Sequence, residues 1–173
     1  MAGEETIRRD RPEGTGKLVL GWFGWVLITL AAGVVGSWLS DVSQSTFYQR
    51  LQRPAWAPPP EIFGPVWTTL FILMGTAAWL VWRKAGFDGA RTTLILYLVH
   101  LIANAAWTGI FFGLEAPGAA FAEIIFLWLF IALLIFRFHR VSTAAGLLLI
   151  PYLVWVTYAS ALTWAIWRMN PGL

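Results

Sequence analysis

The apolar part of this chain contains few side chains that can do chemistry, and His100 and Asn104 are two of them. They stand four residues apart and are followed by Trp107 and Phe111, at positions i, i+4, i+7 and i+11. Because an α-helix turns once every 3.6 residues, this spacing puts all four side chains on one helical face. An imidazole, an amide and two aromatic rings on one face indicate either a ligand-binding surface or a contact between packed helices.

Two other apolar segments carry aromatic side chains at a similar spacing. If the three faces meet, they line a mainly apolar cavity with a few polar anchors, which is the usual form of a small-molecule site. A flat conjugated ligand would stack on such aromatic faces. In the alternative interpretation the rings are core packing, and His100 and Asn104 merely bond a neighbouring helix. The further residues are Trp67, Phe71 and Met74 in one segment and Tyr152, Trp155, Tyr158 and Ala159 in the other.

The remaining polar residues form no catalytic or metal-binding pattern in the sequence. The chain contains no cysteine, which excludes disulfides, thiolate metal sites and thiol nucleophiles. The second histidine, His139, lies in a different apolar segment from His100, so we do not expect the two to bind a metal together. Glu123 is an isolated acid that either reaches the membrane interface, pairs with a polar neighbour or relays protons. We therefore predict no catalytic residues, no metal site and no required cofactor.

Long apolar segments must position these side chains. Hydrophobic residues make up 58% of the 173 residues and charged residues 12%, which is about half the charged share of an ordinary globular domain. Five segments are long enough for a helix to cross a bilayer, and they lack the alternation of barrel strands. The sequence therefore predicts an all-α integral membrane bundle, a single domain over residues 18–173. Its helices are expected at 18–39, 62–82, 92–114, 116–136 and 144–167.

Charged residues near the helix ends predict how the chain is oriented. Residues 1–17 mix acidic and basic side chains and are expected to be a disordered tail. Most basic residues flank the helix ends on the side of the amino terminus, so the positive-inside rule places the amino terminus in the cytoplasm and the carboxyl terminus outside. Because the basic residues are scattered around apolar segments, the net charge of +3 does not indicate nucleic-acid binding.

The first connection between predicted helices is longer than the others. It includes RPAWAPPP at 53–60, where Trp56 stands among prolines that stiffen the chain. Loops longer than about 12–15 residues in compact domains are usually functional or disordered. We expect this loop to pack over one end of the bundle as a lid, with one or two helical turns in STFYQRLQ (45–52). The residues assigned to the lid are Arg53, Pro54, Trp56, Pro58 and Pro59.

Four stretches spread over most of the chain carry a family resemblance. They are FYQRLQRPAWAPPPEIFGPVWTTLFILMG at 47–75, WLVWRKAGF at 79–87, NAAWTGIFFG at 104–113 and PYLVWVTYASALTWAIWRMN at 151–170. In order and spacing they resemble the tryptophan-rich sensory protein and translocator protein (TspO/MBR) family. The resemblance implies a five-helix bundle, usually dimeric, whose cavity opens toward the long first loop. It also implies binding of porphyrins such as protoporphyrin or haem, and mitochondrial members bind cholesterol and benzodiazepine-type drugs.

Positions that match the family motifs imply a set of pocket residues. His100 departs from the pattern, because the family usually has Gln there, and an imidazole adds a titratable group. Trp164 replaces the Tyr of the cholesterol-recognition segment of mitochondrial members, so we do not expect cholesterol as the ligand. The resemblance places Trp67, Phe71, Asn104, Trp107, Tyr152, Trp155 and Ala159 in the pocket, and Trp56 and Pro58 in the loop that covers it.

Three functions remain open on the sequence. The first is a membrane protein that binds a tetrapyrrole or another flat hydrophobic molecule and acts in regulation, sensing or transport, with the bilayer and a second copy of the chain as partners. The second, proposed for some bacterial relatives, is light- or oxygen-dependent degradation of bound porphyrin, with Trp67 and Trp155 as electron donors. The third is a structural or partner-binding protein with a packed core, which the lack of a cavity between the second, third and fifth helices would favour.

Overall fold

The computed structural model describes residues 14–38 and 46–173, and most of this part of the chain is helical. Five helical segments are long and apolar enough to cross a membrane, so the predicted all-α bundle of five membrane helices is confirmed. Most of the predicted charged tail lies outside the described residues. The five segments are α1 (Thr15–Trp38), α3 (Phe63–Gly89), α4 (Arg91–Thr108) with its extension, α5 (Pro117–Val141), and the pair α6 (Thr143–Leu148) and α7 (Ile150–Met169).

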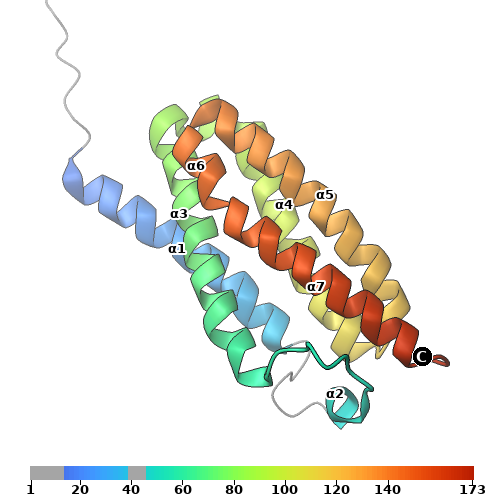
Figure 1. Cartoon of the computed structure of the whole chain (residues 1–173). Helices are drawn as coiled ribbons and strands as arrows, with labels where there is room; N and C mark the ends of the chain where they lie inside the picture. The colour runs from blue at the N-terminus through green and yellow to red at the C-terminus, as the bar shows by residue number, and fades with distance from the viewer. Residues whose placement is uncertain (1–13, 39–45) are drawn as a thin grey trace, which may run out of the picture.

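Three short elements complete the described chain. The helix α2 (Thr46–Arg50) lies in the first loop, within the stretch where the sequence predicted helical turns. The 3-10 turn η1 (Pro60–Ile62) leads from the loop into α3, and the π-helical turn η2 (Gly109–Gly113) extends α4. Figure 1 shows α2 and the described part of the first loop at the same end of the elongated bundle as the carboxyl terminus.

Glycine and proline determine where two of the membrane segments bend. Gly86 has a φ of 67°, a conformation that costs glycine little, and it turns the chain near the end of α3. The last segment breaks at Leu149 into α6 and α7, two residues before Pro151. Proline has no amide hydrogen to donate and its ring clashes with the preceding turn, so the helix restarts there. The segment expected at 144–167 therefore consists of two helices.

The bundle is held by an apolar core that all five segments share. The helix α1 packs on α3 and α4, while α5 packs on α4, α6 and α7. Among the fully buried side chains are Met74 of α3, Tyr97 of α4 and Ile131 of α5. Tyr97 also reaches α1, where its hydroxyl lies 2.6 Å from the Thr29 hydroxyl. This core fixes the three aromatic faces relative to one another.

The first loop packs on the end of the bundle through a second, smaller apolar cluster. Phe47, Tyr48 and Leu51 from the loop are all buried there. The Phe47 ring meets Phe111 of η2 edge-on, with 6.1 Å between the ring centroids. Burying three large side chains in this way attaches the loop to the helices independently of any polar contact. The bundle side of the cluster consists of Phe111, Ala120, Leu162 and Ile166.

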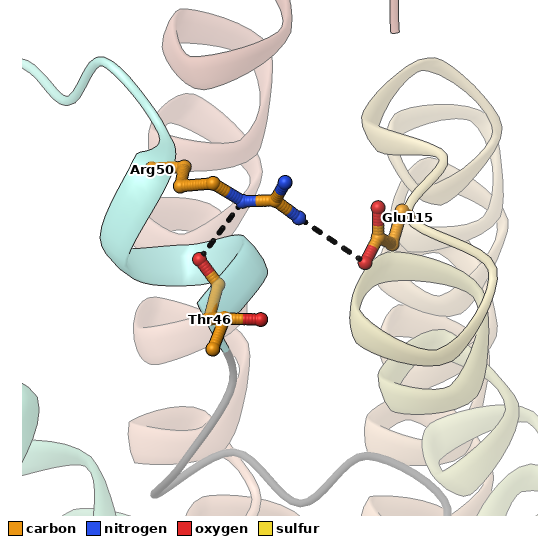
Figure 2. A network of polar contacts seen from close by, with 3 residues as sticks. All are labelled: Thr46, Arg50 and Glu115. Carbon is orange, nitrogen blue, oxygen red and sulfur yellow. Dashed lines mark hydrogen bonds and ion pairs between the residues drawn. The ribbon is translucent and has the colours of Figure 1, made fainter.

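Polar contacts add to this attachment. Figure 2 shows Arg50 of α2, whose guanidinium lies 3.8 Å from the Glu115 carboxylate and donates from Nε to the Thr46 carbonyl oxygen at 3.2 Å. Because both charges are exposed, this ion pair contributes little to stability. Beyond the end of α7, the Asn170 side chain accepts from the Gln52 amide at 3.0 Å and donates to the Gln52 carbonyl oxygen at 2.9 Å. Asn170 therefore bonds both the amide and the carbonyl group of Gln52 in the loop.

Candidate functional site: an aromatic cavity in the bundle

A cavity of about 360 Å³ lies among α1, α3, α4 and α7, at the end of the bundle where the first loop packs. Its volume falls within the range of ordinary small-molecule sites, and its wall is mainly apolar and aromatic, as such walls usually are. Tyr48 of α2 and Pro60 of η1 contribute to the wall, so the first loop forms part of the cavity. The cavity is therefore enclosed by the membrane helices and by the first loop together.

Many of the predicted ligand-binding residues meet in this wall. Trp67 stacks on Phe71 with 5.6 Å between ring centroids, and Trp107 stacks on Phe111 at 5.4 Å. Each pair is separated by four residues, so one helical turn brings its two rings together on the same face. The predicted residues that line the cavity are Trp67, Phe71, Asn104, Trp107, Phe111, Trp155 and Ala159.

Two predicted residues lie behind the wall instead. His100 is 0% exposed and Tyr152 is 1% exposed, and neither lines the cavity. Nε2 of His100 lies 2.9 Å from the Tyr152 hydroxyl, which also accepts from Nδ2 of Asn104 at 2.9 Å. Asn104 lines the cavity, so it connects this buried group of three to whatever the cavity holds.

Trp56 and Tyr158 contact each other outside the cavity wall. The Tyr158 hydroxyl donates to the Trp56 carbonyl oxygen at 3.1 Å, and the two ring centroids lie 5.7 Å apart. The Trp56 ring is 50% exposed, so it does not seal the cavity by itself. The other residues assigned to the lid lie along a separate groove in the loop: Arg53, Pro54, Pro58 and Pro59.

The sequence reasoning missed the wall that α1 provides. Leu30, Gly33 and Val34 are among the α1 residues that line the cavity. A Cβ atom at Gly33 would overlap the Phe71 ring, so the absence of a side chain there lets α3 place this ring against α1. The small residues four apart in α1, Gly33 and Ser37, were the available signal, because such spacing permits close helix approach. This spacing indicates a contact between helices, and in the structure that contact forms one side of the cavity.

Two hydrogen-bond donors of the cavity residues are unused. The buried Nε1 atoms of Trp107 and Trp155 have no hydrogen-bond partner among the residues that the structure describes. A buried polar group without a partner costs roughly 1–3 kcal/mol. Both N–H groups are covered by protein atoms, so the cavity offers the faces of these rings rather than their donors.

Glu123 and the metal-ligating types of side chain form no further site in the described part of the chain. Glu123 of α5 does not line the cavity, and its carboxylate oxygens are buried with no hydrogen-bond partner in the described part of the chain. Within residues 14–38 and 46–173, no three histidine, cysteine, aspartate or glutamate side chains come together as a metal site. The aromatic cavity is therefore the candidate functional site.

This fold and site define a class of protein: a multi-pass helical membrane protein with an aromatic cavity that is completed by a long loop. The sequence profile of the TspO/MBR family matches residues 25–168. The chain belongs to this family.

Individual relatives span nearly the same region. The Tryptophan-rich protein TspO of Chlorobaculum tepidum is 41% identical over 83% of this chain and 92% of its own length. The Tryptophan-rich sensory protein of Cereibacter sphaeroides is 33% identical over 86% of this chain and 92% of its own. The human Translocator protein is 35% identical over 86% of this chain and 89% of its own. The family match thus includes part of α1 and nearly all of the other four membrane segments.

Proposed function

We propose that this protein binds a flat, conjugated and largely apolar molecule of the porphyrin class inside the membrane, in a sensory or transport role. The names of the relatives support the role, since one is called a sensory protein and another a translocator. The cavity supports the ligand class, because stacked rings on α3 and α4 offer flat faces to a conjugated ring system.

The observation that carries the proposal is the set of aromatic faces in an otherwise apolar wall, where Trp67 stacks on Phe71 and Trp107 stacks on Phe111. Trp155 of α7 adds a ring from a further helix, so a flat conjugated ligand meets aromatic side chains from more than one side. A macrocycle that fills the cavity would extend toward Tyr48 and Pro60, where the loop completes the wall.

Titration with protoporphyrin is expected to quench the tryptophan fluorescence of the purified protein in a saturable way. Trp107→Phe reduces one of the stacking faces, and Asn104→Ala removes the amide of the wall. Each should weaken binding several-fold, because a contact worth roughly 0.5–1.5 kcal/mol is lost.

Trp164→Phe is the matched control for this titration, because Trp164 is half exposed on α7 and does not line the cavity. Trp164→Phe makes the same replacement of an indole by a phenyl ring, and it should leave the affinity for protoporphyrin unaltered. If Trp107→Phe and Asn104→Ala both bind protoporphyrin as tightly as the unaltered protein, the cavity is not the binding site.

We also propose that the first loop acts as a lid on this cavity. The loop supplies Tyr48 and Pro60 to the wall, and Asn170 fastens it to the end of α7 at Gln52. Asn170 itself does not line the cavity. Loosening the Asn170 contact would therefore change ligand exchange without changing the ligand's own contacts.

Asn170→Ala is accordingly expected to raise the dissociation rate of bound protoporphyrin several-fold, since it removes both side-chain hydrogen bonds to the loop, which are exposed and together worth about 1 kcal/mol. Stopped-flow fluorescence measures this rate. Thr157→Ala is the control, because Thr157 lies on α7, just beyond which Asn170 stands, and accepts a hydrogen bond from Trp128 rather than contacting the loop. Equal dissociation rates in the two variants would mean that the loop covers the bundle without gating it.

Orientation and assembly complete the proposal. The distribution of basic residues supports a cytoplasmic amino terminus and an external carboxyl terminus. Because the chain has no cysteine, single cysteines introduced at Gly14 or Gly172 can be labelled with a membrane-impermeant reagent, and labelling of Gly14→Cys in intact cells would refute this orientation. We also propose a homodimer, which size-exclusion chromatography with light scattering tests.

A further inference from the structure

Three polar side chains beside the cavity are joined by hydrogen bonds. Tyr152 of α7 stands between His100 and Asn104 of α4, with 2.9 Å from its hydroxyl oxygen to Nε2 of His100 and 2.9 Å to Nδ2 of Asn104. The exposed fractions of the three residues are 1%, 0% and 5%, so water does not compete for these bonds. Of the three residues, Asn104 lines the cavity.

The direction of one of these bonds limits the direction of the other. A tyrosine hydroxyl carries one hydrogen and accepts through its oxygen lone pairs. Where Asn104 donates from Nδ2 to this oxygen, the hydroxyl hydrogen is free to go to Nε2 of His100, which then acts as the acceptor. The neutral imidazole in that tautomer carries its own hydrogen on Nδ1, which is buried with no hydrogen-bond partner among the described residues.

This arrangement decides which half of the Asn104 amide is left over. One of the two Nδ2 hydrogens goes to Tyr152, and the amide oxygen Oδ1 has no hydrogen-bond partner among the described residues, so Oδ1 is left over together with the second Nδ2 hydrogen. If Nε2 of His100 instead donated to Tyr152, the hydroxyl hydrogen would point at Asn104. The amide would then turn so that its oxygen accepts that hydrogen and its NH₂ group is left over. The acceptor on His100 therefore selects an acceptor on Asn104.

We propose that His100 is a positioning residue: acting through Tyr152, it holds Asn104 with its amide oxygen available to the ligand, so that the cavity selects molecules with an N–H donor at this place. A pyrrole-type N–H in a flat aromatic ring is the chemistry that fits. This inference rests on the proposed function in one respect, namely that a flat aromatic molecule occupies the cavity.

The selection should be measurable because a bound ligand covers this oxygen. A ligand without a donor leaves Oδ1 of Asn104 desolvated and unpaired, and sites built around a buried polar group discriminate strongly against such ligands.

Carbazole and dibenzofuran form a suitable pair of probes, since they have the same three-ring shape and differ at one position. Carbazole has an N–H donor there, and dibenzofuran has a ring oxygen. Their affinities for the full chain in detergent micelles are compared by isothermal titration calorimetry. We expect carbazole to bind about tenfold more tightly than dibenzofuran, the effect of one buried hydrogen bond of average to high strength.

Variants at the two supporting positions separate positioning from general packing. His100→Gln keeps an acceptor for the Tyr152 hydroxyl and should keep the preference for carbazole. His100→Leu removes that acceptor, so the hydroxyl hydrogen turns to the Asn104 oxygen and the preference should vanish or reverse. Tyr152→Phe breaks the link while leaving His100 in place, and it should also abolish the preference. A loss of packing alone would weaken both probes to the same extent and leave their ratio unchanged.

Equal binding of the two probes by the unaltered protein would overturn the inference, as would an unchanged tenfold preference in a folded His100→Leu or Tyr152→Phe variant. Thermal unfolding identifies which variants are folded, and either of these two suffices for the decision. The outcome is separate from that of the protoporphyrin titration. A protein that binds protoporphyrin and treats the two probes alike refutes the role of His100 alone, whereas a preference for carbazole without porphyrin binding supports His100 and refutes the porphyrin proposal.

Discussion

Replacing Gly75 by alanine is expected to lower the free energy of unfolding by roughly 1–3 kcal/mol, the usual cost of overfilling a packed core. A Cβ atom at Gly75 on α3 would lie 2.7 Å from Cα of Val26 and 3.1 Å from the Trp25 carbonyl oxygen on α1. Both are backbone atoms, so the added methyl group can be accommodated only if the two helices move apart. Unfolding of the protein in mixed micelles by increasing sodium dodecyl sulfate, followed by circular dichroism, measures the change.

Gly24→Ala is the control for this experiment. Gly24 lies on α1, and a Cβ atom there would meet no atom within 4 Å. Because alanine favours helix over glycine by up to about 1 kcal/mol, this variant should be as stable as the unaltered protein or more stable. Similar stabilities for Gly75→Ala and Gly24→Ala would show that α1 and α3 do not pack as closely as the structure has them.

The position of α1 matters for the site as well as for stability. The contact at Gly75 and the one at Gly33 lie on the same pair of helices, and Gly33 is part of the cavity wall. A displacement of α1 at Gly75 would therefore also disturb the place where Phe71 rests. The packing of α1 on α3 and the shape of the cavity therefore both depend on glycines at the contact between these helices.

Periodicity predicted the composition of individual faces well. Asn104, Trp107 and Phe111 were grouped by their spacing on one helix, and all three line the cavity. The grouping is possible because helical backbone keeps its side chains close to a fixed period, and the short π-helical turn that carries Phe111 does not move this ring off the face. The long apolar segments likewise sufficed for the all-α membrane fold, because a helix satisfies its own backbone hydrogen bonds in lipid.

The sequence did not indicate which residues of a helical face line the cavity and which lie behind its wall. His100 shares the face of Asn104 but lies one turn away, behind the wall. Tyr152 is likewise behind the wall, although Trp155 on the same helix is part of it. Where a cavity begins and ends depends on how several helices cross, and the spacing within one helix does not contain that information.

The loop shows a similar limit. Its composition indicates that aromatic side chains dock on the bundle, and Phe47 and Tyr48 are buried there. Trp56, the most conspicuous ring of the proline-rich stretch, is half exposed and contacts Tyr158 instead. Irregular backbone has no period from which the direction of a side chain can be inferred, so the sequence predicts that the loop packs but not which ring lines the cavity.

Filling the cavity from α7 is expected to have the largest effect on ligand binding. Ala159 lines the cavity and is buried, and the benzyl group of Ala159→Phe would occupy space that the ligand needs. The affinity for protoporphyrin should fall by about 100-fold or more, because the rigid ring must either exclude the ligand or be pushed into a core with little free space. Fluorescence quenching by protoporphyrin measures this loss, and thermal unfolding should show that the variant remains folded.

Ala161→Phe provides the matched control, since Ala161 lies two residues further along α7 on an exposed face of the helix. A phenylalanine there would face lipid, which is as apolar as the side chain, and should change neither folding nor affinity. The comparison separates occupation of the cavity from the general effect of a larger residue in α7. Comparable affinities in the two variants would place the porphyrin on another surface. A loss confined to Ala159→Phe would mean that the ligand needs the space between α1, α3, α4 and α7.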